Sequence, residues 1–203
     1  MSMVIDGFET DLWLRVAYVA AAIPFTIIRL LANKRCGQVT SKNDFLESAW
    51  IRIGIRVCET LGAAGMVAWI LNPHWMQWSA LEMDSGLRWF GVFLIFLGTV
   101  FTWWVHETLG DNFSPFLHVR KNHELITSGP YAFVRHPMYT GLFTVLFGTF
   151  FITSNIFIFL MTAGVLAVLL VYRIPREESV LMEAFPNEYD RYTNNRPRFV
   201  PGF

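Results

Sequence analysis

The chain has 203 residues, of which 54% are hydrophobic and only 16% charged, and its mean hydropathy is +0.39. So few charged side chains cannot coat a soluble globule of this size, which excludes an ordinary soluble domain. The 16 basic and 16 acidic residues cancel, and no cluster of basic and aromatic residues suggests base stacking, so we expect no nucleic-acid partner.

Three apolar segments in the first half of the chain are long enough to cross a membrane, which takes about 20 residues. They are residues 12–31, 50–71 and 87–109. No basic residue precedes the first segment, so it is expected to be a retained helix and not a cleaved signal peptide. Arg52, Arg56 and Glu59 share one helical face of the second segment, and we expect this face to look into the bundle or to reach toward the membrane surface.

A fourth apolar run, residues 138–174, is too long for one crossing, because a single helix of that length would extend about 55 Å. The polar triplet 153–155 lies near its middle and predicts a tight turn between two antiparallel helices. The sequence therefore predicts an all-α membrane bundle of five transmembrane helices. We expect a single membrane domain over 1–203, with an N-terminal two-helix region over 1–86 and a core over 87–203.

Basic residues occur in alternate connections. Lys and Arg are present in 32–49, in 110–137 and in the tail after the last span, whereas the N-terminus, 72–86 and the turn near Asn155 have none. Because basic loops stay in the cytoplasm, this alternation predicts a multi-pass protein with its N-terminus outside and its C-terminus cytoplasmic.

Two segments outside the spans are predicted to be ordered. Loop 110–137 is polar and rich in turn-forming residues. Residues 177–192 carry apolar and aromatic side chains at spacings of four, four and three, which predicts one amphipathic helix on the membrane face. Pro175 favours a helix start just before it.

Several familiar sites are absent from the sequence. There is no glycine-rich phosphate loop, no HExxH and no GxSxG motif. Cys36 and Cys58 have neither a CxxC spacing nor histidines at a zinc-binding spacing, so we predict two free thiols and no metal site.

A polar constellation adjoins the last two predicted spans. Its members are residues 123–126, 129–131, 135–141, Arg173, and 177–178. Each member has an ordinary explanation when taken alone, such as a basic helix entry, interfacial tyrosines or an arginine that reaches the membrane surface. The two ends of a helical hairpin return to one membrane face with axes about 8–10 Å apart, so we expect these segments to converge at the cytosol–lipid boundary.

The order and spacing of these motifs resemble the isoprenylcysteine carboxyl methyltransferase family. The matching stretch runs His-Glu-Leu-Ile-Thr-Ser-Gly-Pro-Tyr-(x3)-Arg-His-Pro-Met-Tyr-Thr-Gly over 123–141, followed by Arg173-(x3)-Glu-Glu. The pattern Phe185-(x2)-Glu-Tyr-(x2)-Tyr and a proline-rich end complete the resemblance, which covers about residues 110–203. It implies a membrane enzyme that uses S-adenosylmethionine, releases S-adenosylhomocysteine and methylates the carboxylate of an isoprenylcysteine or a similar lipid.

The resemblance also implies roles for individual residues. Arg173 is implied to hold the substrate carboxylate, in a cytoplasmic pocket that loop 110–137 and the C-terminal amphipathic helix close. The implied cofactor-binding residues are His118, His123, Glu124, Leu125, Ile126, Tyr131, His136, Pro137, Met138, Tyr139 and Glu177.

Three other functions are consistent with the composition. A phospholipid or amine N-methyltransferase would need a base near the methyl group, because an amine must lose a proton, whereas a carboxylate is already ionised at neutral pH. A membrane reductase that uses NADPH is another, and a non-enzymatic membrane scaffold or small transporter is the third.

Overall fold

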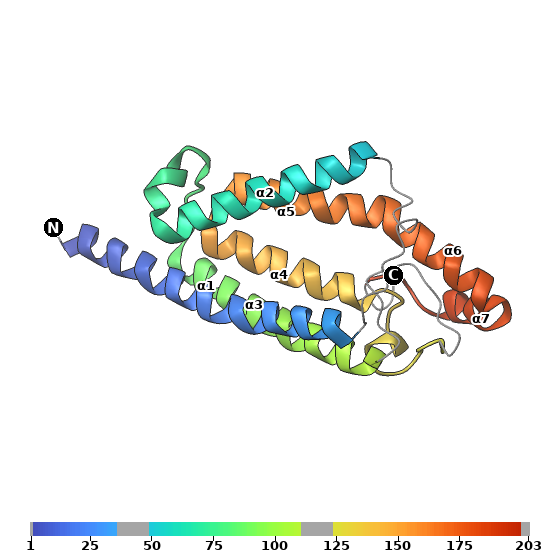
Figure 1. The fold of residues 1–203 in the computed structure, drawn as a ribbon. Helices are drawn as coiled ribbons and strands as arrows, with labels where there is room; N and C mark the ends of the chain where they lie inside the picture. Colours follow the sequence, from blue (N-terminus) through green and yellow to red (C-terminus); the bar gives the residue numbers. More distant parts are fainter. Residues whose placement is uncertain (1, 36–48, 111–123, 200–203) are drawn as a thin grey trace.

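The structure, a computed structural model, describes residues 2–35, 49–110 and 124–199, and every named element in these ranges is a helix. The longer helices run along a common direction, as Figure 1 shows. They are α1 (Ser2–Arg35), α2 (Ala49–Leu71), α3 (Ser85–Leu109), α4 (Pro137–Thr153) and α5 (Ile156–Val168). Shorter elements are the 3-10 helices Pro73–Ser79 and Gly129–Ala132, the π-helix Leu169–Arg173, and helices α6 (Ile174–Ala184) and α7 (Pro186–Asn195).

Within the described ranges, four helices are long and apolar enough to span a membrane, and α4 is a shorter apolar helix. The four are Asp11–Lys34, Ala49–Leu71, Ser85–Leu109 and Ile156–Ala184. The predicted all-α, multi-pass membrane bundle is therefore confirmed.

The predicted turn between α4 and α5 is present, and two polar residues fix it. Ser154 adopts a left-handed backbone conformation with φ of 48°, which ends α4. The Asn155 side chain caps α5 by accepting from the Ile158 amide at 3.1 Å. It also donates to the Met76 carbonyl at 3.0 Å and accepts from the Ser79 hydroxyl at 3.1 Å, so the hairpin turn is held against the 3-10 helix that follows α2.

Helices α3 and α4 make the most extensive contact among the described elements, and glycines allow their close approach. A Cβ placed on Gly148 would lie 2.8 Å from the Gly91 carbonyl oxygen and 2.7 Å from a side-chain carbon of Ile95. One Cβ on Gly98 would likewise lie 3.2 Å from the carbonyl oxygen of Gly141. Small residues at matched positions let helix backbones meet within lipid, where apolar burial gives no net driving force.

Helix α2 packs on α5 through a different face from the one that carries its charges. Cys58, a free thiol, lies near Gly164, and Gly62 faces Met161. Arg56 and Glu59 are exposed, so the alternative in which this charged face looks into the bundle is wrong for these two residues. The reason is that α2 packs on α5 through its small residues, such as Cys58 and Gly62, and these lie on a different face from Arg56 and Glu59. Cys36 lies outside the described residues.

The C-terminal region differs from the single amphipathic helix predicted over 177–192. Helix α6 begins at Ile174 with Pro175 in its first turn, as expected, but it follows the π-helix directly, so the helical segment from α5 into α6 is continuous. The helical chain then breaks at Phe185, which has φ of −133° and ψ of 60°. Pro186 disfavours the α conformation of the residue before it, so α7 begins as a separate helix.

We expect a Gly148→Ala variant to be destabilised by about 1–3 kcal/mol, because overpacking a tight interface forces its backbones apart. The matched control is Gly54→Ala, at a position where an added Cβ meets nothing within 4 Å. Thermal unfolding of both variants in detergent measures the difference. Equal stability of the two variants would contradict the close α3–α4 contact.

Candidate functional site

The site is built around the start of α4. His136 precedes the helix with φ of −125° and ψ of 59°, and Pro137 occupies the first helical position, where its fixed φ suits the helix and its missing N–H costs nothing. His136 and Tyr139 are both buried, and their rings meet edge to face with centroids 6.0 Å apart. We call residues 135–139 the α4 corner.

Two adjacent carboxylates on α6 face this corner. The Glu178 oxygen Oε1 lies 3.0 Å from an Nη of Arg135 and 3.1 Å from the His136 nitrogen Nε2. Its other oxygen accepts from Arg198 at 2.7 Å. Glu178 therefore joins α6, the α4 corner and the C-terminal segment, although sequence reasoning assigned it no role. The available signal was the Glu-Glu pair itself.

The neighbouring carboxylate connects the same histidine with Arg173. The Arg173 Nε group donates to Glu177 at 3.0 Å, one helical turn apart. The other oxygen of Glu177 lies 3.8 Å from His136 Nδ1. His136 thus sits between the two carboxylates, and the structure brings together three of the predicted site residues. A π turn contains an additional residue, so the π-helix that ends at Arg173 changes which helical face the following residues occupy.

The C-terminal segment, residues 196–199, lies along the α4 corner. The backbone amides of Arg135 and His136 donate to the carbonyls of Pro197 and Arg198, each at 2.9 Å. The Phe199 ring packs against the His136 ring with centroids 6.2 Å apart. Sequence reasoning did not predict this pairing, because it joins backbone groups about 60 residues apart and leaves no local pattern.

Three tyrosines surround the cluster. Tyr192 donates from its hydroxyl to the Tyr131 carbonyl at 2.7 Å, which fixes the turn before the corner. Burial raises the pKa of Tyr131, and the nearby negative charge of Glu177 raises it further. Burial also raises the pKa of Tyr192, and that of Tyr189 to about 12. All three side chains are therefore neutral phenols at physiological pH.

The turn that holds Tyr131 requires a glycine. Gly129 has φ of 58°, and a Cβ there would lie 2.7 Å from the Thr108 hydroxyl. Both facts favour glycine, since left-handed backbone suits it and no side chain fits against α3.

The other predicted cofactor residues are less enclosed. Leu125 and Ile126 are half-buried in the segment before this turn, and Glu124 is exposed. His118 and His123 lie outside the described residues.

One residue of α1 also reaches the corner. The Arg29 guanidinium lies 3.3 Å from the sulfur of Met138, and Ala32 is buried against Met138 and Leu109. Sequence reasoning placed no site residue in the first two helices, because no motif marks them.

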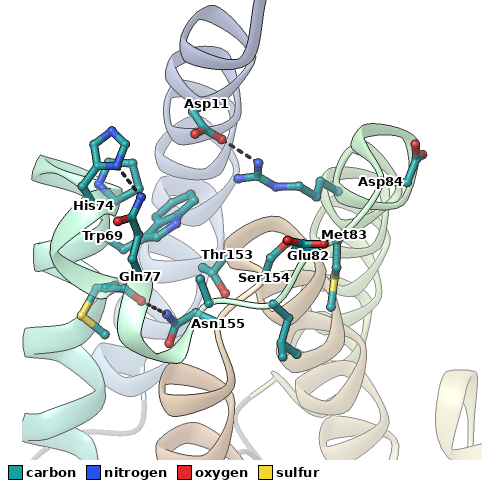
Figure 2. Close-up of a pocket in the computed structure, with 15 residues that line it drawn as sticks. Asp11, Trp69, His74, Gln77, Glu82, Met83, Asp84, Thr153, Ser154 and Asn155 are labelled. Atoms are coloured by element: carbon teal, nitrogen blue, oxygen red, sulfur yellow. Dashed lines mark hydrogen bonds and ion pairs between the residues drawn. The ribbon is translucent and has the colours of Figure 1, made fainter. Parts of the chain in front are cut away.

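A pocket of about 460 Å³ lies at the opposite end of the bundle, beside the α4–α5 turn (Figure 2). An ion pair of 2.6 Å between Arg88 and Asp11 crosses it, and Arg88 also donates to the Ile152 carbonyl. None of the predicted site residues that the structure describes lines this pocket, so the predicted site lies at the other end of the bundle.

The chain matches a family model and several characterised proteins. The model of the phospholipid methyltransferase family matches residues 87–188, just over half of the chain. Protein-S-isoprenylcysteine O-methyltransferase of Schizosaccharomyces pombe is 35% identical over 94 residues, which are 45% of this chain and 40% of that protein. The nickel-cobalt-cadmium resistance protein NccN of Alcaligenes xylosoxydans xylosoxydans is 29% identical over 77% of this chain and 68% of its own length.

A solved structure shares the fold. It is that of isoprenylcysteine carboxyl methyltransferase, a eukaryotic intramembrane Ras methyltransferase. The two structures superpose with a TM-score of 0.53 at 24% sequence identity, over 81% of this chain and 57% of the other chain. The chain spans about two fifths to three fifths of the length of the first two isoprenylcysteine methyltransferases it matches. The resemblance predicted from the motifs is confirmed, and the chain belongs to the phospholipid methyltransferase family.

Proposed function

We propose that the protein is an integral membrane carboxyl O-methyltransferase that uses S-adenosylmethionine and acts on the carboxylate of an isoprenylcysteine or a similar lipid. The observation that carries this proposal is the ion-pair cluster in which His136 lies between Glu177 and Glu178 while Arg173 pairs with Glu177. It places a guanidinium, a carboxylate and aromatic rings at one end of an apolar bundle.

The described residues fit a sulfonium cofactor. Glu177 supplies negative charge for the cation, and the rings of Tyr131 and Tyr139 supply aromatic faces that attract it. Glu178 has three cationic or imidazole partners. Among the residues that the structure describes, Glu177 contacts Arg173 closely and His136 at a longer distance. Glu177 is therefore the carboxylate we assign to the cofactor.

Arg173 suits a carboxylate acceptor. Its Nε group donates to Glu177, which orients the planar guanidinium and directs its two Nη groups away from that contact. Paired donors from one guanidinium bind both oxygens of a carboxylate, which lysine does not reproduce.

The reaction needs no base. S-adenosylmethionine, when bound, would supply an activated methyl group, with Glu177 holding its sulfonium and Arg173 holding the acceptor carboxylate toward it. No proton moves, because the acceptor is already ionised. The residues contribute by holding both reactants in line and by excluding water from a reaction that neutralises two opposite charges.

The distribution of Lys and Arg among the connections bears on orientation. We infer a cytoplasmic C-terminus, with the cofactor entering from the cytosol and the acceptor tail entering from the bilayer.

An amine N-methyltransferase is the second candidate, and the name of the matched family favours it. Such an enzyme needs a base, whereas the Arg173 guanidinium suits a carboxylate acceptor, which needs none. We therefore expect a methylated product from a lipid acid that releases methanol on mild alkaline treatment. A product that resists alkali would indicate an amine acceptor and overturn the proposal.

Arg173→Ala should reduce methyl transfer to N-acetyl-S-farnesylcysteine by about 100-fold or more, because it removes the donors that orient the carboxylate. Arg176→Ala is the matched control, since Arg176 is the exposed arginine on the same helix. Radiolabelled methyl transfer measures activity, and calorimetry with S-adenosylhomocysteine should show nearly unchanged affinity. Normal turnover by the Arg173 variant would remove this residue from the mechanism.

Glu177→Gln should weaken binding of S-adenosylmethionine by about tenfold and that of S-adenosylhomocysteine much less, because only the former carries the sulfonium charge. Glu183→Gln is the control, as Glu183 is exposed on α6. Calorimetric titration of each variant with both ligands gives the comparison. Equal losses for the two ligands would argue against charge pairing with the sulfonium.

A further inference from the structure

The outer side of α2 carries two charges that have no partner in the described part of the chain. In Figure 1, α2 lies at the edge of the bundle beside α5, on which it packs. Arg56 and Glu59 are exposed, and among the described residues neither forms an ion pair within 4.0 Å. Ile53 and Val67 on the same side are 52% and 55% exposed, so this side of the helix is uncovered along its length.

Glu59 lies near the middle of the span, as two independent measures show. It is ten residues from the start of α2 at Ala49 and twelve from its end at Leu71, which are about 15 Å and 18 Å along the axis. Its chain neighbour Cys58 lies beside Gly164 of α5. Gly164 is eight residues from the start of α5 and nine from the end of the π-helix. The Glu59 carboxylate is therefore close to the centre of the hydrocarbon, where water cannot solvate it.

A carboxylate at this depth requires a cation. Ionisable side chains within the hydrocarbon are costly and almost always pair with one another or face the interior of a bundle. The long side chain of Arg56 can extend toward the membrane surface, whereas Glu59 is too short to do so. Since the described residues of the same chain offer Glu59 no cation, we look for one on a neighbouring molecule.

The exposed residues of α2 have the spacing of a helix–helix contact. They recur at intervals of three and four, which is the pattern of two parallel helices that pack side by side. We call this stripe the α2 seam, and it comprises Ile53, Arg56, Thr60, Ala63 and Val67. Thr60 and Ala63 are small, which lets two helix backbones approach closely in lipid. Glu59 lies at the edge of the α2 seam, next to Arg56.

We propose that the α2 seam is the interface of a homodimer, in which the α2 helices of two copies pack side by side in the membrane. Copies inserted in the same orientation have parallel α2 helices, related by a twofold axis along the membrane normal. Arg56 and Glu59 are offset by three residues, or about 4.5 Å along the axis, which an arginine side chain spans. Each Arg56 then pairs with Glu59 of the second copy, and the four charges cancel.

A second copy of this chain is the occupant that the charge pattern fits. The seam carries one cation and one anion at adjacent turns, so it is complementary to itself under twofold symmetry. A purely apolar partner helix would leave both charges unpaired. This inference goes beyond the proposed function, because the interface lies on α2 and involves none of the predicted site residues.

Cross-linking in membranes tests whether the α2 seam meets itself. Ala63→Cys is introduced into the full-length chain with Cys36→Ser and Cys58→Ala, and Val100→Cys on the exposed side of α3 is the matched control. Oxidation with copper phenanthroline should link Ala63→Cys at least about tenfold faster than the control, because a disulfide joins only Cβ atoms about 3.5–4.5 Å apart. Equal rates at the two positions, or no dimer from Ala63→Cys, overturn the proposal.

Charge variants test the reciprocal ion pairs. Energy transfer between donor- and acceptor-labelled copies in phospholipid vesicles measures association over a series of lipid-to-protein ratios. Glu59→Gln should weaken association by about tenfold or more, because it leaves two arginines facing each other in lipid. Glu183→Gln, which removes an exposed carboxylate from α6, should associate as the wild type does. Arg56→Glu combined with Glu59→Arg should recover association, because the pairs form again with their signs exchanged.

Three results overturn the proposal. They are a wild type that stays monomeric at every ratio, unchanged association of Glu59→Gln, and an exchanged double variant that unfolds at the wild-type temperature but remains monomeric. Cross-linking of Ala63→Cys retains both native charges, so that test stands whether or not the charge variants fold. Neither measurement needs methyl transfer, and both are therefore independent of the outcome for Arg173 and Glu177.

Discussion

Two neighbouring carboxylates at the end of a membrane helix need cationic partners, and this requirement brings several distant segments of the chain together at one end of the bundle. Glu177 and Glu178 cannot be withdrawn from water without cationic partners. Those partners come from three parts of the chain: Arg135 and His136 before α4, Arg173 at the end of the π-helix, and Arg198 in the C-terminal segment. The same contacts that neutralise the carboxylates assemble the candidate site.

The opposite end of the bundle supplies the rigidity on which this assembly depends. The α4–α5 turn is capped by Asn155 and tied to the 3-10 helix after α2. Arg15 of α1 donates to the last carbonyls of α2, where a positive charge complements the helix dipole. The glycine contacts between α3 and α4 then fix the distance between the hairpin and the rest of the bundle. With one end fixed in this way, the starts of the site helices have little freedom to separate.

The parts of the fold that depend on local pattern could be predicted from the sequence. Span lengths and the turn at residues 153–155 follow from apolar runs and from polar residues that favour turns. The break at Phe185 was equally local, since Pro186 marks it, but the apolar spacing over 177–192 concealed it. Periodicity alone cannot distinguish one long amphipathic helix from two short ones that share a buried face.

The parts of the site that depend on long-range pairing could not be predicted in the same way. Glu178 is recognised as the centre of the cluster only when its partners from distant segments are seen together. The backbone pairing of residues 197–198 with the α4 corner involves no side-chain pattern. No motif marks Arg29 of α1, so its approach to Met138 could not be predicted from the sequence.

The unbroken passage from α5 through the π-helix into α6 has a consequence for how the protein sits in its membrane. Arg173 is carried by the same rod that crosses the lipid, so its height above the bilayer centre is set by the apolar length of α5. A guanidinium on a flexible loop could change its height in a thicker or thinner membrane. The height of Arg173 changes only when the helix tilts or the bilayer deforms. The length of this helix therefore matches the height of Arg173 to one bilayer thickness.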